Sequence, residues 1–148
     1  MINKDQKIKE VLERGVENIY PSKEALEKVL KSGKKIRLYN GIDPTGKLHI
    51  GHGVVLNKLR QFQDLGHEVI VLIGDFTATI GDPTDQGSAR KILPRKQVLD
   101  NAKDYKKYIT KILDKKKTIF KHNSEWLDKL KFEDLIKLMV DADLQRFK

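Results

Sequence analysis

The sequence contains no cysteine, and only four of its 148 residues are proline. The absence of cysteine excludes a disulfide scaffold and any zinc or iron–sulfur site with thiolate ligands, and it fits a reducing cytoplasm. Long apolar runs are absent too, since the longest, residues 69–73, falls far short of the ~20 residues that cross a bilayer. Residues 1–7 carry no apolar signal core, so we expect neither a membrane span nor export.

Acidic residues are in deficit, because 21 Asp and Glu stand against 30 Lys and Arg, for a formal net charge of +9. Such an excess favours anionic partners such as nucleotides or RNA through long-range attraction, although it also serves solubility alone. A chain of this length, with 39% hydrophobic residues, is sufficient for one domain with its own core.

Hydrophobic periodicity predicts alternating helices and strands. An amphipathic helix is expected from Ile8 to the break at Pro21, and a second one begins after the N-cap Ser22 and ends at Gly33. Strands are expected at residues 36–42, 68–73 and 118–122. Helices are expected between the strands, at about 51–65 and 98–112. After the last strand, one helical segment is expected to follow the N-cap Ser124, and a last helix is expected to contain Leu135 to Met139.

The order of these elements predicts an α/β fold. Residues 68–73 are apolar at nearly every position, as in a parallel strand that is buried on both faces. We expect a Rossmann-like (HUP-type) parallel sheet with flanking helices, of strand order 3-2-1, and only the N-terminal half of such a sheet. The expected division is N-terminal helices over 1–34, a nucleotide-binding half-domain over 35–130 and the start of a further helical region over 131–148.

Chemically unusual residues gather after the first expected strand. Residues 41–52 read Gly-Ile-Asp-Pro-Thr-Gly-Lys-Leu-His-Ile-Gly-His and pass directly into a helix. Ligands of open parallel sheets bind beyond the carboxyl ends of the strands, where helix N-termini attract anions. His49 and His52 would donate hydrogen bonds to phosphate oxygens there, and Gly51 would allow a close approach of backbone or ligand. The plainer alternative is that both imidazoles only cap the helix or face solvent.

Residues 41–52 resemble the HIGH motif of the class I aminoacyl-tRNA synthetases. Three further segments, 57–67, 74–84 and 123–127, are similar to bacterial tyrosyl-tRNA synthetases. The Ile-Gly-Asp-Pro turn within the second of these segments distinguishes the pattern from the tryptophanyl enzymes. The resemblance covers most of residues 35–130 and is weaker in the N-terminal helices.

The resemblance implies a tyrosine–tRNA ligase, which uses ATP to convert tyrosine into tyrosyl-adenylate and then esterifies tRNA(Tyr) in protein biosynthesis. It implies that Tyr39 hydrogen-bonds the substrate phenol and that Asp82 lies near the substrate ammonium. The residues that it assigns to ATP are Gly41, Asp43, Thr45, His49, Gly51 and His52. Of these, Thr45, His49 and His52 are the expected catalytic group, which holds the phosphates. Mg²⁺ accompanies the ATP, and no metal ligand is expected from the protein.

Simpler roles are open for several of these residues. Tyr39 would be a core aromatic of its strand, and Asp43 and Asp82 would be turn residues before proline. The resemblance also implies a cytoplasmic protein that forms homodimers at full length, with residues 131–148 beginning the connective region that helps form the dimer. Apolar Leu144 and Phe147 would then lack their usual cover. Arg90, Lys91 and Arg95 are candidates for contacts with phosphate or the tRNA acceptor stem.

Parts of a full-length tyrosyl-tRNA synthetase have no counterpart in the sequence, namely a second half of the sheet, a Lys-Met-Ser-Lys-Ser loop and an anticodon-binding region. We therefore expect a correspondence to the N-terminal catalytic half, as a fragment or a short natural form. Two alternatives stay open. One is a small nucleotidylyltransferase with a His-x-Gly-His phosphate site, and the other is a non-catalytic RNA-binding protein, which the charge of +9 suggests.

Overall fold

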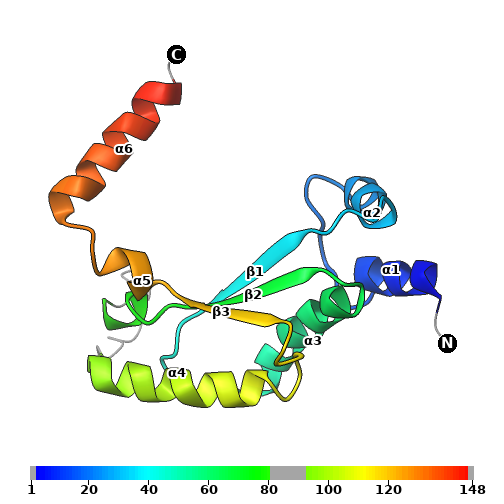
Figure 1. The fold of residues 1–148 in the computed structure, drawn as a ribbon, viewed down its shortest axis with the longest axis horizontal. Helices are drawn as coiled ribbons and strands as arrows, with labels where there is room; N and C mark the ends of the chain where they lie inside the picture. Colours follow the sequence, from blue (N-terminus) through cyan, green and yellow to red (C-terminus); the bar gives the residue numbers. More distant parts are fainter. Residues whose placement is uncertain (1–2, 81–92, 147–148) are drawn as a thin grey trace.

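A parallel three-stranded sheet forms the centre of the molecule in a computed structural model that describes residues 3–80 and 93–146. Its strands are β1 (Arg37–Ile42), β2 (Glu68–Ile73) and β3 (Thr118–His122), in the order β1-β2-β3. Helix α3 (Ile50–Asp64) connects the first pair of strands and α4 (Arg95–Ile109) the second (Figure 1). The α/β fold and the strand order predicted from the sequence are confirmed.

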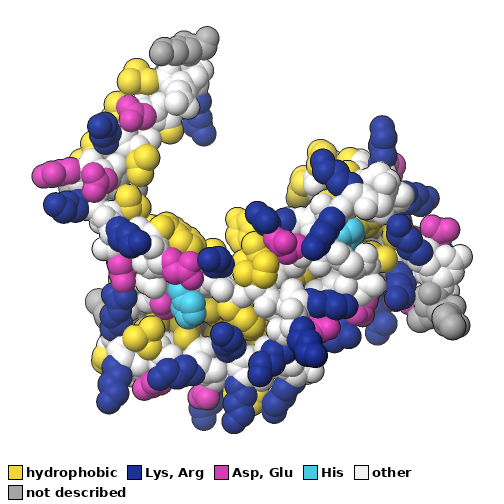
Figure 2. All heavy atoms as spheres, viewed as in Figure 1, with side chains coloured by type: hydrophobic (Ala, Val, Ile, Leu, Met, Phe, Trp, Pro, Cys, Tyr) yellow, Lys and Arg dark blue, Asp and Glu magenta, His cyan; other side chains and the backbone are white. Residues whose placement is uncertain are grey.

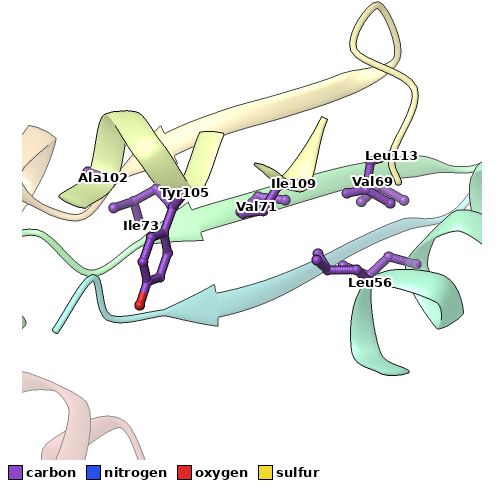
Figure 3. Close-up of a cluster of buried hydrophobic side chains, with 9 residues drawn as sticks. Leu56, Val69, Val71, Ile73, Ala102, Tyr105, Ile109 and Leu113 are labelled. Atoms are coloured by element: carbon purple, nitrogen blue, oxygen red, sulfur yellow. The ribbon is translucent and has the colours of Figure 1, made fainter. Parts of the chain in front are cut away.

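One face of the sheet carries the main core. Val69, Val71 and Ile73 of β2 are each at most 1% exposed and pack against α3 and α4 (Figure 3). The helices contribute Leu56, Leu59, Ala102, Tyr105 and Ile109, and Leu113 closes the cluster. Both crossover helices lie on this side of the sheet in Figure 1, so the core holds the strands and both helices as one unit.

The opposite face of the sheet is open. Tyr39, Ile70 and Ile119 are paired in register across the three strands, and Tyr39 is 72% exposed. Figure 2 shows apolar side chains at the surface on the side away from α3 and α4. The prediction that residues 68–73 are buried on both faces is therefore wrong, because in the described chain α3 and α4 cover the same face.

The first N-terminal helix is shorter than the apolar pattern predicts, whereas the second has the predicted ends. α1 (Lys4–Glu13) ends well before Pro21, because Gly15 turns the chain in the left-handed region at φ +64°. α2 (Lys23–Lys31) begins as predicted, since Ser22 Oγ accepts a hydrogen bond from Ala25 N at 3.2 Å. Gly33, at φ +75°, follows its end.

Helix α3 is attached to α1 by one lysine. Lys58 Nζ donates hydrogen bonds to the carbonyl oxygens of Val11 at 2.8 Å and Arg14 at 2.6 Å. These carbonyls belong to the end of α1, where helical partners run out. Burial lowers the pKa of Lys58, with a smaller contribution in the same direction from the charge of Arg14. The contact ties the N-terminal helices to the helix that carries the His-Ile-Gly-His run.

The C-terminal part comprises a short helix and a long one. Asn123 precedes α5 (Ser124–Leu127), so the prediction of Ser124 as N-cap is wrong; Ser124 instead donates its hydroxyl to Asp75. The long helix, α6 (Phe132–Arg146), projects away from the sheet in Figure 1. Leu144 is 59% exposed, as predicted, and Phe147 lies outside the described residues. No helix among the described residues is both long and apolar enough to cross a membrane.

A buried histidine precedes β2. His67 is 9% exposed, and its Nδ1 faces the backbone N–H of Ile36 at 3.5 Å. Burial lowers the pKa of His67, and the charge of Lys4 lowers it further. The folded state therefore favours the neutral ring, whereas the unfolded chain takes up a proton as the pH falls past its ordinary pKa of about 6.5.

We predict that His67 costs no stability above about pH 6.5, where its ring is neutral in both the folded and the unfolded state. As the pH drops below this value toward the lowered pKa of the folded state, the free energy of unfolding should fall. A His67→Gln variant keeps a hydrogen-bond acceptor but does not titrate, so its stability should depend less on pH. Urea unfolding between pH 7.5 and pH 5 measures the difference. Equal pH dependence in the two proteins would show that His67 is not responsible.

Candidate functional site

Two histidines cap the N-terminus of α3 reciprocally. His49 is the N-cap residue, and its Nδ1 accepts a hydrogen bond from Gly51 N at 3.2 Å. His52 Nδ1 in turn accepts from the backbone N–H of His49 at 3.2 Å. The rings lie 4.1 Å apart between centroids. This arrangement is a capping box built from imidazoles, and it satisfies two backbone donors that the helix leaves free.

The capping bonds leave one donor on each ring. A ring nitrogen that accepts a hydrogen bond carries no proton, so a neutral His49 and a neutral His52 each carry their proton on Nε2. Both rings therefore cap the helix through Nδ1 and retain an Nε2–H for an anion at the positive end of the helix dipole. The capping role and the anion-binding role considered for this pair are compatible.

The close approach predicted at Gly51 is made by the protein itself. A Cβ at this position would lie 3.0 Å from Cε1 and 3.1 Å from Nδ1 of His49. A Cβ there would require the imidazole to shift by a few tenths of an ångström. Gly51 thus sets the position of the His49 ring.

A hydrogen-bonded series joins the chain segments that follow the three strands. After β1, Asp43 Oδ1 accepts from Thr77 Oγ1 at 2.9 Å. Thr77, in the short helix η1 (Thr77–Thr79) after β2, accepts in turn from Asn123 Nδ2 at 3.0 Å. Asn123, after β3, also accepts from the backbone N–H of Phe76 at 2.8 Å. The carboxylate of Asp43 is thereby held at the carboxyl edge of the sheet.

Gly74 lies at the crowded centre of this series. A Cβ on Gly74 would lie 1.8 Å from Asp43 Oδ1 and 2.6 Å from Thr77 Oγ1, both far inside contact distance. The missing side chain therefore makes room for the carboxylate and for the hydroxyl that binds it.

A buried carboxylate, Asp75, fastens β3 to the end of β2. Asp75, 4% exposed, accepts from Ser124 Oγ at 2.8 Å and Ser124 N at 3.1 Å, and it faces His122 Nδ1 at 3.1 Å. Burial by itself raises the pKa of Asp75, but the hydrogen bonds from Ser124 and the nearby His122 outweigh it and lower the pKa below its ordinary value. Asp75 is thus an ionised anchor between the ends of β2 and β3.

Two adjoining hollows open at this edge of the sheet and share Gly41, Ile42 and Asp43 in their walls. The first, of about 370 Å³, brings together four residues predicted to bind ATP: Gly41, Asp43, Thr45 and His52. The second, of about 410 Å³, is lined also by Leu72, Gly74, Thr77 and Asn123. His49 lies outside both and lines a third hollow of about 440 Å³ with His52 and α4.

Of the two residues predicted to bind the substrate tyrosine, the structure describes Tyr39 but not Asp82. Tyr39 is not a core residue, because its side chain lies on the open face of β1, the face that Gly41 shares. Its ring is available to a ligand. Asp82 lies outside the described residues, as do Arg90 and Lys91. Arg95 is described, and its guanidinium is paired with the carboxylate of Asp128.

Sequence reasoning missed three residues of the site, although they lie in segments 74–84 and 123–127: Gly74, Thr77 and Asn123. The available signal was their position directly after expected strands, where parallel sheets bind ligands.

Within residues 3–80 and 93–146, no group of three or more His, Asp or Glu side chains could hold a metal ion.

Comparison with known proteins adds a family to this geometry. Residues 31–147 match the family described as class I tRNA synthetases (W and Y). Tyrosine–tRNA ligase of Carboxydothermus hydrogenoformans is 56% identical over 133 residues, which are 87% of this chain and 32% of that protein. Tyrosine–tRNA ligase 2 of Vibrio vulnificus is 49% identical over 136 residues, 91% of this chain and 34% of that protein. The chain thus spans about a third of these relatives.

Solved structures share the fold. Tyrosyl-tRNA synthetase of Archaeoglobus fulgidus, complexed with L-tyrosine, superposes with a TM-score of 0.70 at 24% identity over 96% of this chain and 41% of that one. A C-terminally truncated mitochondrial tyrosyl-tRNA synthetase of Aspergillus nidulans gives a TM-score of 0.68 at 21% identity, over 88% of this chain and 41% of that one. At these identities the likeness shows the Rossmann-like arrangement of strands and helices.

Proposed function

This chain belongs to the class I tRNA synthetases of the tryptophan and tyrosine family, and from that premise we propose that it supplies the ATP-binding half of a tyrosine–tRNA ligase. The observation that carries the proposal is the pair of imidazoles that cap α3 through Nδ1 and keep both Nε2–H groups for phosphate. Asp43 lines the same hollow as His52. The relatives' names supply the amino acid, tyrosine, and the tRNA.

The proposed reaction begins with tyrosine activation. The tyrosine carboxylate attacks the α-phosphorus of ATP, an oxygen–phosphorus bond forms, and pyrophosphate leaves with the electrons of the broken bond. His49 and His52 donate to phosphate oxygens as negative charge builds on them, and Thr45 adds a hydroxyl in the hollow that it shares with His52. The 3′ end of tRNA(Tyr) then takes the tyrosyl group from the adenylate and releases AMP.

The second hollow is the proposed place of the amino acid. Tyr39 offers its phenol on the open sheet face, and Asp82 is proposed to hold the ammonium group. Gly41 leaves open space for the nucleotide, and Gly51 is proposed to contribute to ATP binding by leaving room for the His49 ring. Asp43, in the wall of both hollows, lies where the amino acid and the α-phosphate must meet.

Mg²⁺ is proposed to arrive with ATP, bound to its phosphate oxygens. The described ranges 3–80 and 93–146 offer no cluster of three ligands, and Asp43 is the carboxylate in the ATP hollow. This arrangement fits an ion held mainly by substrate phosphates and water, as Mg²⁺ commonly is. The ion would neutralise phosphate charge there.

We propose the division 1–34, 35–130 and 131–148, with ATP and tyrosine bound by the middle region and the last region beginning a dimer contact, in a cytoplasmic protein. The exposed apolar side chains of α6 support the dimer contact: Ile136, Leu138, Met139, Val140 and Leu144. The nucleotidylyltransferase and RNA-binding alternatives are not favoured, since the matched relatives are tyrosine–tRNA ligases.

The test of this function is tyrosine-dependent exchange of labelled pyrophosphate into ATP. We predict exchange with tyrosine and none with phenylalanine, because only tyrosine offers a hydroxyl to Tyr39. The assay is run on the 148-residue chain and on a chimaera in which it replaces the aligned part of the Carboxydothermus enzyme. Exchange by the unmodified Carboxydothermus enzyme is the control. Loss of exchange in the chimaera, or equal exchange with every amino acid, would contradict the proposal.

A further inference from the structure

Two side chains of α4 contact the turn formed by residues 43–46. Asn101 Nδ2 donates a hydrogen bond to the carbonyl oxygen of Pro44 at 2.9 Å. Tyr105 is 3% exposed and extends from α4 toward the segment that follows β1 (Figure 3). It lines the same hollow as Gly46, the last residue of the turn. Residues four apart share one face of a helix, and we call Asn101 and Tyr105 the α4 brace.

The turn has little support of its own. Proline contributes no N–H, and among the described residues the turn's internal backbone bond runs from Thr45 N to Asp43 O at 2.9 Å. Pro44 is fully buried, so its carbonyl oxygen needs a partner inside the protein. Asn101 is that partner. Without the amide donor, the carbonyl would be buried unpaired, and the turn would shift to reach water.

The other half of the brace is fixed by the core. The Tyr105 ring packs with Ile73, Ala102 and Ile109, so the hydroxyl is presented to the turn from a rigid base. Burial raises the pKa of Tyr105, and the N–H of Gly46 offsets part of that rise, so the phenol stays neutral at neutral pH. The core of the sheet and the turn are thereby joined through one side chain.

We propose that Asn101 and Tyr105 are positioning residues, which hold the turn carrying Asp43 and Thr45 in the shape that receives ATP. The inference rests on the proposed function and adds to it two residues of α4. Neither side chain needs to touch the nucleotide. The brace acts on the placement of Asp43 and Thr45, two of the residues that line the ATP hollow.

The test uses substitutions that remove single contacts. Asn101→Asp replaces the donating nitrogen by an oxygen that cannot donate to Pro44, and Tyr105→Phe removes only the hydroxyl. We expect each variant to bind ATP with Mg²⁺ about tenfold more weakly by titration calorimetry, the loss of roughly one hydrogen bond's worth of positioning. Hydrogen–deuterium exchange should accelerate in the peptide spanning residues 43–48 and stay unchanged in β2.

Matched controls lie on the same helix. Gln97→Glu and Tyr108→Phe make the equivalent chemical changes at exposed positions of α4, and they should bind ATP as the wild type does. Asn101→Gln keeps an amide donor and should recover part of the lost affinity. If Asn101→Asp fails to fold, Tyr105→Phe still tests the brace because its ring packing is retained.

The outcomes separate the two proposals. A wild-type chain that binds no ATP would overturn the proposed function. A wild-type chain that binds ATP, with brace variants of equal affinity, would overturn the brace alone. Weaker binding accompanied by faster exchange throughout the sheet would reduce Asn101 and Tyr105 to a general structural role and contradict positioning.

Discussion

A Gly74→Ala variant is expected to fold and yet to lose tyrosine activation by about 10²-fold or more, the cost of displacing a binding group by roughly 1 Å. The added methyl group would lie 1.8 Å from Asp43 Oδ1 and 2.6 Å from Thr77 Oγ1. Both clashing atoms belong to side chains that can rotate away, so the backbone of β2 can remain in place. We therefore expect the fold to accommodate the methyl group, while the Asp43 carboxylate is displaced from its position.

The measurement combines exchange kinetics with thermal unfolding. Gly53→Ala is the matched control, because the same methyl group in α3 would approach only Ile50 Cδ1, at 3.9 Å. That variant should keep its exchange rate and gain stability from the better helix propensity of alanine. A Gly74→Ala protein with wild-type exchange would show that Asp43 is not held where the reaction takes place.

The largest loss is expected when both imidazoles are removed. A His49→Ala/His52→Ala variant should exchange pyrophosphate on the order of 10³-fold more slowly, because one preorganised donor to a developing oxyanion is worth about 10²–10³ and two neighbouring donors do not add fully. Affinity for ATP, measured by calorimetry with Mg²⁺, should fall as well. Unchanged affinity would remove the phosphate assignment.

The helix cap and the phosphate contact must be told apart, because His49 and His52 serve both. A His49→Ser variant keeps a strong N-capping side chain and removes the imidazole Nε2–H. We expect its helix content and unfolding midpoint to match the wild type while exchange stays slow. Recovery of exchange in His49→Ser would mean that capping, and not donation to phosphate, is what the residue supplies.

Much of the fold could be predicted from the sequence because its strands and turns have strong local determinants. Residues 68–73 and 118–122 form strands with the predicted bounds, and Ser22 caps α2 as expected. Predictions from the apolar pattern were wrong where the outcome depends on other segments of the chain or on a single glycine. An unbroken run such as 68–73 indicates that a strand can be covered on both faces, but whether a second layer is there depends on other segments. Gly15 ended α1 against an apolar period that continued past it.

The site was predictable in part for the same reason. His49, His52 and Asp43 are neighbours in the sequence, so their motif is visible in one stretch. Gly74 and Asn123 are 49 positions apart in the chain and meet only because parallel strands end at one edge. The contact between Asn101 and Pro44 likewise spans 57 positions, and no spacing rule within α4 predicts it.

The absence of cysteine and the polarity of the sheet together make the protein convenient for fluorescence work. The site lies at the carboxyl edge, whereas the link between α4 and β3 lies at the other end of strands that span roughly 17–20 Å. Asp114 orders that link by accepting a hydrogen bond from Lys116 N at 2.9 Å, which any residue except proline at position 116 can donate. A cysteine replacing Lys116 would be the sole thiol of the chain, so a maleimide dye would attach at one known point, well away from bound ATP.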